Sequence, residues 1–258
     1  MKRVSGIIVS ALLVMGMLVV LSGCGQKTTE KQPEKVLTVV TEASFAPFEF
    51  KQEDKFVGFD IELINAIGAA EGYKVQITHM GFDSLIPALQ SNKADCAISG
   101  MSITPERKKS IDFSTSYFDA GLIIAVPKAT EGISTLDDLQ GKKIAGQVGT
   151  IGADACDGVK AKDPKTEIKY FDAIGEAFME MEKGGIDAVV NDQAVTAYYI
   201  QTTGKDKVKM VGDVFSAEDQ YGIAVKKGNT EILKVINDGL AKIKANGEYD
   251  KIYKKWFE

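Results

Sequence analysis

Short apolar runs alternate with amphipathic segments along the chain from residue 36 onward. The apolar runs predict strands, which we place at 37–40, 75–80, 94–99, 122–126, 143–146, 168–171, 188–191 and 221–225. Apolar residues at helical spacing predict helices over 58–67, 82–91, 152–159, 174–183, 192–202 and 231–246, and a short last helix that holds Tyr253, Trp256 and Phe257. This alternation predicts an α/β protein whose mainly parallel sheet is covered on both faces and binds ligands at the carboxyl ends of its strands.

Some helix boundaries are marked by residues that satisfy free backbone groups. Asp60 is placed to cap the helix over 58–67, because an Asp side chain accepts hydrogen bonds from the first turn. Gly72 is expected to end this helix. Thr104 followed by Pro105 predicts a further helix start, with Thr as the cap and Pro in the first position.

Residues 1–23 have a pattern unlike the rest of the chain. Lys2 and Arg3 precede an uncharged apolar run over 7–21, and small residues follow before Cys24. This pattern predicts an export signal, whereas the alternative, a membrane-spanning helix, needs about 20 apolar residues. The small-small-Cys ending resembles a lipobox, which implies cleavage before Cys24 and diacylation of its thiol. Because several acyl chains anchor a protein stably, we expect lipid anchoring on the outer face of the cytoplasmic membrane, at the cell surface or in the periplasm.

Composition and charge narrow the class of partner. The 258 residues are 45% hydrophobic and 26% charged, which is typical of a globular protein and excludes collagen, a coiled coil and long disorder. Residues 25–35 carry no apolar side chain, so we expect 24–35 to be the lipidated Cys and a flexible tether. Loss of Lys2 and Arg3 with the signal changes the net charge from −5 to −7. Such an acidic chain is a poor candidate for nucleic acid or for electrostatic attachment to anionic lipid.

Cysteine and histidine are too few for most metal or nucleophilic sites. Cys96 lies in a predicted strand and Cys156 in a predicted helix. They could pair, but we interpret them as two buried small side chains, and no spacing suggests a metal site. His79 is the only His, so a zinc site or a catalytic triad is disfavoured, and we expect it to be structural. No cofactor is predicted.

A glycine-rich segment over 146–152, GQVGTIG, follows a predicted strand and opens a predicted helix. Its spacing is not that of a dinucleotide fingerprint, and no phosphate-binding Lys follows it. We therefore expect the backbone N–H groups of this helix start to meet a ligand carboxylate rather than a nucleotide.

Six separated segments resemble the polar-amino-acid-binding proteins of ABC importers, extracellular solute-binding protein family 3. They occur in the family's order over nearly all of residues 36–258: APFEF (46–50), GFDIELINAI (58–67), SGMSITPERK (99–108), IDFS (111–114), DAVVND (187–192) and YKKWF (253–257). The chain is similar to the glutamine-binding and the lysine/arginine/ornithine-binding members.

The resemblance implies a type II periplasmic-binding-protein-like fold, in which two α/β lobes are joined by two hinge strands. Lobe one would comprise 36–117 and 221–258, and lobe two would comprise 122–216. The chain would cross between them near 118–121 and 217–220. A free amino acid would be trapped between the lobes by hinge closure and delivered to a membrane permease. We expect a monomer.

The resemblance also implies which residues would bind the carboxylate and the ammonium of the ligand. Arg107 would bind the carboxylate through its two parallel N–H groups, with Gly100 and Ser102 beside it. Without the motif, Arg107 would be an exposed member of the basic run 107–109. Asp192 would bind the ammonium; as a lone Asp at a strand end it could also cap the next helix.

Two aromatic walls and a set of polar residues would select the ligand's side chain. Phe45 and Phe82 match the aromatic walls, although Phe at such positions is usually core. Glu42, Gln147, Thr150 and Asn191 would meet the side chain, and Gln147 and Asn191 depart from the Lys and His of the glutamine binders. Arg107 against Glu42 and Asp192 gives one positive and two negative charges, which favours arginine, lysine or ornithine, with glutamine next.

Two other functions fit the same fold. One is a prephenate or arogenate dehydratase, for which Glu42 is the only obvious spare carboxylate in the cleft. The other is a detached amino acid sensor, which would need a partner. The match of Glu42 to a binding position favours the transport receptor over an enzyme.

Overall fold

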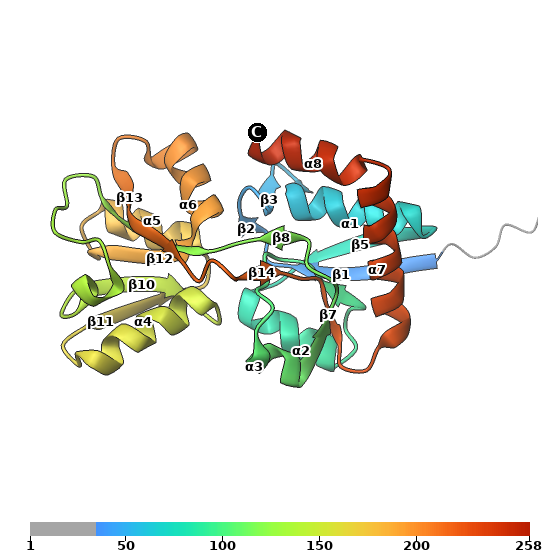
Figure 1. Ribbon diagram of the computed structural model, residues 1–258, viewed down its shortest axis with the longest axis horizontal. Coiled ribbons are helices and arrows are strands. Elements are labelled where there is room, and N and C mark those ends of the chain that lie inside the picture. The colour runs from blue at the N-terminus through green and yellow to red at the C-terminus, as the bar shows by residue number, and fades with distance from the viewer. Residues whose placement is uncertain (1–34) are drawn as a thin grey trace, which may run out of the picture. The chain divides into compact units, whose positions relative to one another are not determined.

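The computed structural model describes residues 35–258. The predicted export signal, Cys24 and the tether up to Glu34 lie outside the described residues. Within 35–258 the chain forms two lobes, each built on its own five-stranded sheet (Figure 1). The two-lobe α/β fold is therefore confirmed. No helix of the described part is long and apolar enough to cross a membrane.

The sheet of the first lobe has the strand order β5-β1-β6-β15-β7. The strands are β1 (Lys35–Thr41), β5 (Tyr73–His79), β6 (Cys96–Ala97), β7 (Ile111–Phe113) and β15 (Ala224–Lys226). β1 pairs in parallel with β5 and β6, whereas β15 is antiparallel to both of its neighbours. The helices of this lobe are α1 (Phe59–Ala70), α2 (Leu85–Gln90), α3 (Pro105–Ser110), α7 (Thr230–Ala245) and α8 (Glu248–Phe257).

The sheet of the second lobe has the order β11-β10-β12-β9-β13. The strands are β9 (Leu122–Pro127), β10 (Lys143–Gln147), β11 (Glu167–Phe171), β12 (Ala188–Asp192) and β13 (Val208–Phe215). β10, β11 and β12 run parallel, and β9 and β13 are added antiparallel. The helices are α4 (Ile151–Lys162), α5 (Ile174–Glu182) and α6 (Gln193–Tyr199), followed by a π-helical turn, η3 (Ile200–Gly204). Each sheet is thus mixed, with its parallel strands in the predicted places.

The chain passes between the two sheets twice. β8 (Phe118–Asp119) and β14 (Gln220–Tyr221) lie side by side at these passages and form a two-stranded antiparallel ribbon between the lobes (Figure 1). Next to the ribbon, the rings of Phe48 and Phe118 meet edge to face with their centroids 4.8 Å apart. The ribbon therefore starts from an aromatic part of the first lobe's core.

The C-terminal aromatic residues pack on the first lobe, as predicted. Phe257 of α8 lies 5.2 Å from the ring of Phe59, centroid to centroid, and Tyr253 and Trp256 border the same core. α8 therefore packs its aromatic side chains on the core of the first lobe.

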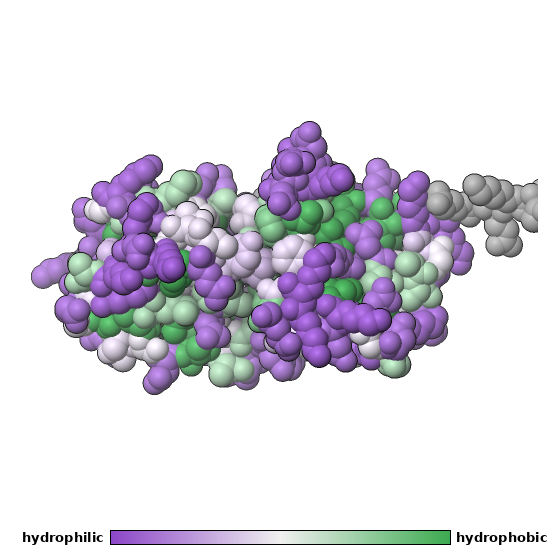
Figure 2. All heavy atoms as spheres, turned by 90° about the horizontal axis from the view of Figure 1, so that it is seen from above, coloured by the Kyte–Doolittle hydropathy of each residue, from purple (hydrophilic) through white to green (hydrophobic). Residues whose placement is uncertain are grey.

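In the view from above, polar side chains cover most of the surface and apolar ones appear only in small areas between them (Figure 2).

Asp60 is not the cap of α1, contrary to the prediction. The cap position belongs to Gly58, and the free N–H groups of Phe59 and Asp60 donate to the carbonyls of Pro47 and Phe48 at 2.9 and 2.8 Å. Because backbone carbonyls satisfy the helix start, the Asp60 side chain is free to point into the core, where it is fully buried.

Other boundaries differ from the sequence prediction where the chain is irregular. The strand expected over 94–99 is only β6, the helix over 82–91 begins as the 3₁₀ turn η1 (Phe82–Ser84), and 221–225 divides into β14 and β15. Not predicted were the small sheet β2 (Ser44–Phe45), β3 (Glu49–Gln52) and β4 (Lys55–Val57), the strands β7, β8 and β13, and the 3₁₀ turn η2 (Leu136–Leu139). Their short or mixed polar segments lack a clear period.

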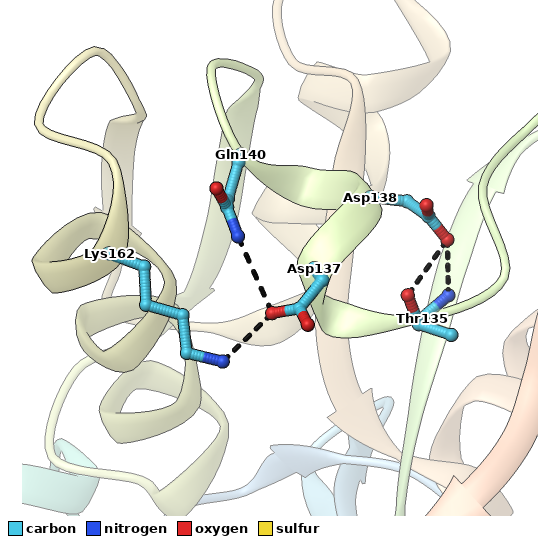
Figure 3. A network of polar contacts seen from close by, with 5 residues as sticks. All are labelled: Thr135, Asp137, Asp138, Gln140 and Lys162. Atoms are coloured by element: carbon cyan, nitrogen blue, oxygen red, sulfur yellow. Dashed lines mark hydrogen bonds and ion pairs between the residues drawn. The ribbon is translucent and has the colours of Figure 1, made fainter.

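The turn η2 is fixed to the second lobe by polar contacts (Figure 3). Thr135 and Asp138 form a reciprocal capping box, with the Thr135 N–H 2.8 Å from Asp138 Oδ2. Asp137 accepts from Lys162 Nζ at 2.8 Å, which ties the turn to the end of α4. Gln140 Nε2 donates to the same carboxylate at 3.4 Å. This network lies away from the cavity described next.

Candidate ligand-binding site

Residues of both lobes line one cavity between the two sheets. Its walls come from β2, η1, the segment after β6, α3, the end of β10, the start of α4 and the end of β12. The lining residues are Phe45, Phe82, Ser99, Gly100, Ser102, Arg107, Gln147, Thr150, Ile151 and Asp192. Of the predicted site residues, all except Glu42 and Asn191 line the cavity, and Ser99 and Ile151 were not predicted.

Arg107 is held by its helix and reaches across to the second lobe. α3 begins as predicted, with Thr104 Oγ1 accepting from the Arg107 N–H at 3.1 Å and Pro105 in the first turn. The guanidinium donates through Nη1 to Ser102 O at 2.8 Å and through Nη2 to Gly149 O at 3.0 Å. Its Cζ lies 5.3 Å from the centre of the Phe82 ring. Arg107 is therefore a cation with a fixed direction and donors aimed at both lobes.

Asp192 ends β12 and faces the cavity. It occupies the cap position of α6 but makes no side-chain cap bond. Instead, its carboxylate accepts a hydrogen bond from the Tyr221 hydroxyl. Burial raises the pKa of Asp192 to about 7, although this bond opposes the shift. A cationic group beside Asp192 would favour the ionised carboxylate.

Glu42 and Gln147 contact each other across the lobes. Gln147 Nε2 donates to Glu42 Oε2 at 3.3 Å and to Asp172 O at 2.9 Å, and the Ser44 hydroxyl donates to the other oxygen of Glu42. Burial raises the pKa of the Glu42 carboxyl, and the bonds from Ser44 and Gln147 oppose this rise. Glu42 does not itself line the cavity but lies directly behind Gln147, which does.

Thr150 and Asn191 have structural partners. Thr150 caps α4, because its hydroxyl oxygen accepts from the Ala153 N–H at 3.2 Å, and it still lines the cavity. Asn191 Nδ2 instead contacts Asp192 O at 3.4 Å and Thr196 Oγ1 at 3.3 Å, at the start of α6. The structure therefore does not bring Asn191 to the cavity.

Asp219 is a buried acid near the cavity that was not predicted. Its Oδ2 accepts from Ser102 Oγ at 3.0 Å. Burial raises the pKa of Asp219, and the charge of Arg107 lowers it. Asp219 lies in a polar segment with no motif, so no sequence signal marked it. It adds its carboxylate to those of Asp154 and Asp192, which also act on Arg107, the cation that lines the cavity.

The remaining candidate residues take structural places. His79 Nδ1 accepts from the Ala43 N–H at 2.9 Å, consistent with a structural role. Cys96 and Cys156 are both free and buried, and burial raises the pKa of the Cys156 thiol to about 12. Over residues 35–258, no cluster of His, Cys, Asp and Glu could hold a metal ion.

The comparisons with known proteins agree on one family. The model of the bacterial extracellular solute-binding proteins, family 3, matches residues 37–258. A probable histidine-binding protein of Neisseria gonorrhoeae is 37% identical over 246 residues, covering 92% of this chain and 90% of the relative. The arginine-binding extracellular protein ArtP of Bacillus subtilis (strain 168) is 35% identical over 240 residues, covering 92% of each.

A solved structure shows the same arrangement of elements. An ancestral arginine-binding protein bound to arginine superposes with a TM-score of 0.83 at 49% identity. The match covers 86% of this chain and 98% of that one. The similarity therefore extends over both lobes.

Proposed function

Because the chain belongs to the bacterial extracellular solute-binding proteins of family 3, we propose that it is the substrate-binding component of an ABC importer for basic amino acids. The observation that carries the ligand class is the charge around the cavity. One cation, Arg107, lines the cavity and is influenced by the charges of Asp219, Asp154 and Asp192, and Glu42 lies behind Gln147. The relatives named for histidine and arginine support the same class.

The ligand's carboxylate would bind Arg107. A guanidinium matches a carboxylate through two parallel N–H groups, and Ser102 and Gly100 lie on the same wall. The helix start of α4 faces this wall, with Thr150 at its cap, so its N–H groups favour a negative group there. The ligand's ammonium would bind Asp192, whose burial makes an unpaired charge costly.

The ligand's side chain would extend between Phe45 and Phe82 towards Gln147 and Glu42. Flat aromatic faces accept an aliphatic stem or a guanidinium. The backbone groups of a free amino acid carry no net charge, so they leave the cavity negative. A positively charged side chain would reduce this excess negative charge. Arginine, lysine and ornithine therefore come first, and glutamine, which can bond Gln147 without a charge, comes next.

The test is thermal unfolding of residues 26–258 with each common amino acid at about 1 mM. A ligand at 100 times its Kd adds about 2.7 kcal/mol, and each kcal/mol raises Tm by roughly 2–4 °C at this size. Shifts with arginine, lysine or ornithine are expected. A shift with glutamine alone would keep the receptor but contradict the charge argument, and no shift with any amino acid would contradict the receptor.

The proposed function includes export and an anchor. Cys24 would carry the lipid, residues 24–35 would be the tether, and the protein would act as a monomer. Lobe one would comprise 36–117 and 221–258, with lobe two over 122–216. Expression of Cys24→Ser should release the protein from the membrane fraction and abolish incorporation of labelled palmitate; persistence of either would contradict the anchor.

The function proposed here involves no bond making or breaking. The relatives reported above are named as binding proteins, and Glu42, the spare carboxylate, is hydrogen-bonded to Ser44 and Gln147. A depletion assay with prephenate and arogenate should leave both substrates intact over hours. Consumption of either would show a dehydratase instead.

A further inference from the structure

Two acidic side chains lie buried beneath the cavity with no basic partner. Glu49 of β3 and Asp60 of α1 both have 0% exposure, and their carboxyl groups lie close enough for the charge of Asp60 to act on Glu49. No ion pair joins either carboxyl to a Lys, Arg or His within residues 35–258. Two buried negative charges in contact, with no cation beside them, would be strongly unfavourable.

Hydrogen-bond donors satisfy only half of the pair's oxygens. Ser99 Oγ donates to Glu49 Oε1 at 2.9 Å. The Gly100 N–H and the Tyr117 hydroxyl donate to Asp60 Oδ2 at 2.9 and 2.8 Å. The other two oxygens, Glu49 Oε2 and Asp60 Oδ1, are buried without any donor. One proton between them would supply both missing partners, because it makes one oxygen a donor and leaves the other an acceptor.

We propose that Glu49 and Asp60 share one proton and act as a positioning pair for the ligand site. The pair is hydrogen-bonded to three other residues, Ser99, Gly100 and Tyr117, and the first two of these line the cavity. Ser99 Oγ also accepts from the Glu42 N–H at 2.9 Å, so the contact continues to the acid behind Gln147. The link to an amino acid ligand rests on the proposed function, whereas the shared proton does not.

The charged and titratable groups around the pair favour retention of one proton by the pair. Besides each other, the titratable groups that interact with them are Glu42, which follows β1, Tyr117, which precedes β8, and Tyr249 of α8. Burial, followed by the charges of Asp60 and Glu42, raises the pKa of Glu49 well above its ordinary value. Burial raises the pKa of Asp60 to about 6, while its bonds from Gly100 and Tyr117 oppose this. Glu49 is thus the carboxyl that keeps the proton.

The test is the pH dependence of unfolding of wild type, Glu49→Gln and Asp60→Asn without any amino acid. An amide replaces the shared proton, since its NH₂ group donates to the neighbouring carboxylate. The folded wild type holds a proton that the unfolded chain releases above the ordinary pKa of Glu, so its stability falls as pH rises through this window. From about pH 5.5 to 7.5, its unfolding equilibrium constant should rise roughly 100-fold more than that of either variant.

The exposed Glu53→Gln is the matched control and should follow the wild type. If the unfolding equilibrium constant changes equally with pH in wild type and in Glu49→Gln, the proposal is overturned. Failure of both amide variants to fold at pH 7 would also overturn it. Arginine affinity at pH 7 is measured separately and should stay within about threefold of wild type in both amide variants. In Asp60→Leu, which cannot accept from the Gly100 N–H, arginine affinity should fall by about tenfold or more, and an affinity equal to that of Asp60→Asn would overturn the positioning role. If wild type itself binds no amino acid but the slopes differ, the shared proton stands and the proposed function fails.

Discussion

At the scale of single residues, the direction of the Arg107 guanidinium matters as much as its charge. Lys would keep the charge but lose the two parallel donors that match a carboxylate. We expect Arg107→Lys to weaken arginine binding by about 10–100-fold, corresponding to roughly 1.4–2.8 kcal/mol. Isothermal titration calorimetry measures the change. Lys109→Gln, on the exposed side of α3, is the control and should bind like wild type.

The buried Asp192 should make binding depend on pH. Its pKa of about 7 in the unliganded cavity means that half of its carboxyls are protonated near neutrality. The ligand ammonium requires the carboxylate, so binding below this pH releases a proton. Kd should rise by up to about tenfold for each pH unit below 7.

Titration of arginine from pH 8 to 5 checks this expectation. In Asp192→Asn, arginine binding should be weaker at pH 8, and Kd should lose most of its dependence on pH. A Kd that stays constant from pH 8 to 5 in wild type would show that Asp192 does not bind the ammonium.

The role of a residue could be predicted from the sequence only where neighbouring residues form a recognisable pattern. Arg107 follows a recognisable Thr-Pro helix start inside a motif, and the structure places it in the cavity. Asp60 fits the local pattern of a cap, but the backbone carbonyls of Pro47 and Phe48 in the preceding β2–β3 hairpin satisfy the helix start, and its side chain is buried. Asp219 is hydrogen-bonded to Ser102, 117 positions away in sequence, and such pairing is invisible in one sequence.

At the scale of elements, Gly58 links β4 to α1 and packs closely on Phe48 in the turn of the β2–β3 hairpin. Its φ is +131°, and a Cβ there would lie 2.1 Å from the carbonyl oxygen of Phe48. Gly58→Ala combines backbone strain with a collision against main chain, so we expect a loss of about 3 kcal/mol or more in the free energy of unfolding. Denaturant unfolding measures it.

Gly72 offers the matched control for this substitution. It also has a positive φ, +73°, but nothing lies within 4 Å of a Cβ there. Gly72→Ala should cost only the backbone strain, about 1–2 kcal/mol. Equal losses in the two variants would mean that the hairpin can move away from α1 at little cost.

Elements with a clear apolar period were predictable, and those fixed by distant contacts were not. The strands β1, β9, β10 and β12 are apolar along most of their length because they lie inside their sheets. β13 carries a register shift between Val211 and Phe215, which interrupts its alternation. Short segments such as β8 and β14 become strands only because they lie beside each other.

At the scale of the whole folded part, the lobes also meet at a second place outside the ligand cavity. Phe50 of the first lobe lies 6.2 Å from Tyr198 of α6 and 5.9 Å from Trp256 of α8, measured between ring centroids. A contact present only when the lobes are together favours that state whichever ligand is bound. This contact should therefore raise the affinity for every ligand by the same factor and leave the selectivity among ligands unchanged.

Tyr198→Ala tests this separation of affinity from selectivity. An aromatic pair contributes about 0.5–1.5 kcal/mol beyond its buried area, so Kd should rise by roughly 2–10-fold. The factor should be the same for arginine, lysine and glutamine, because Tyr198 does not line the cavity. Tyr170→Ala, on an exposed side chain of the same lobe, should leave all three values unchanged. A change that differs among the ligands would mean that the second contact shapes the cavity, and tighter binding would mean that it opposes closure.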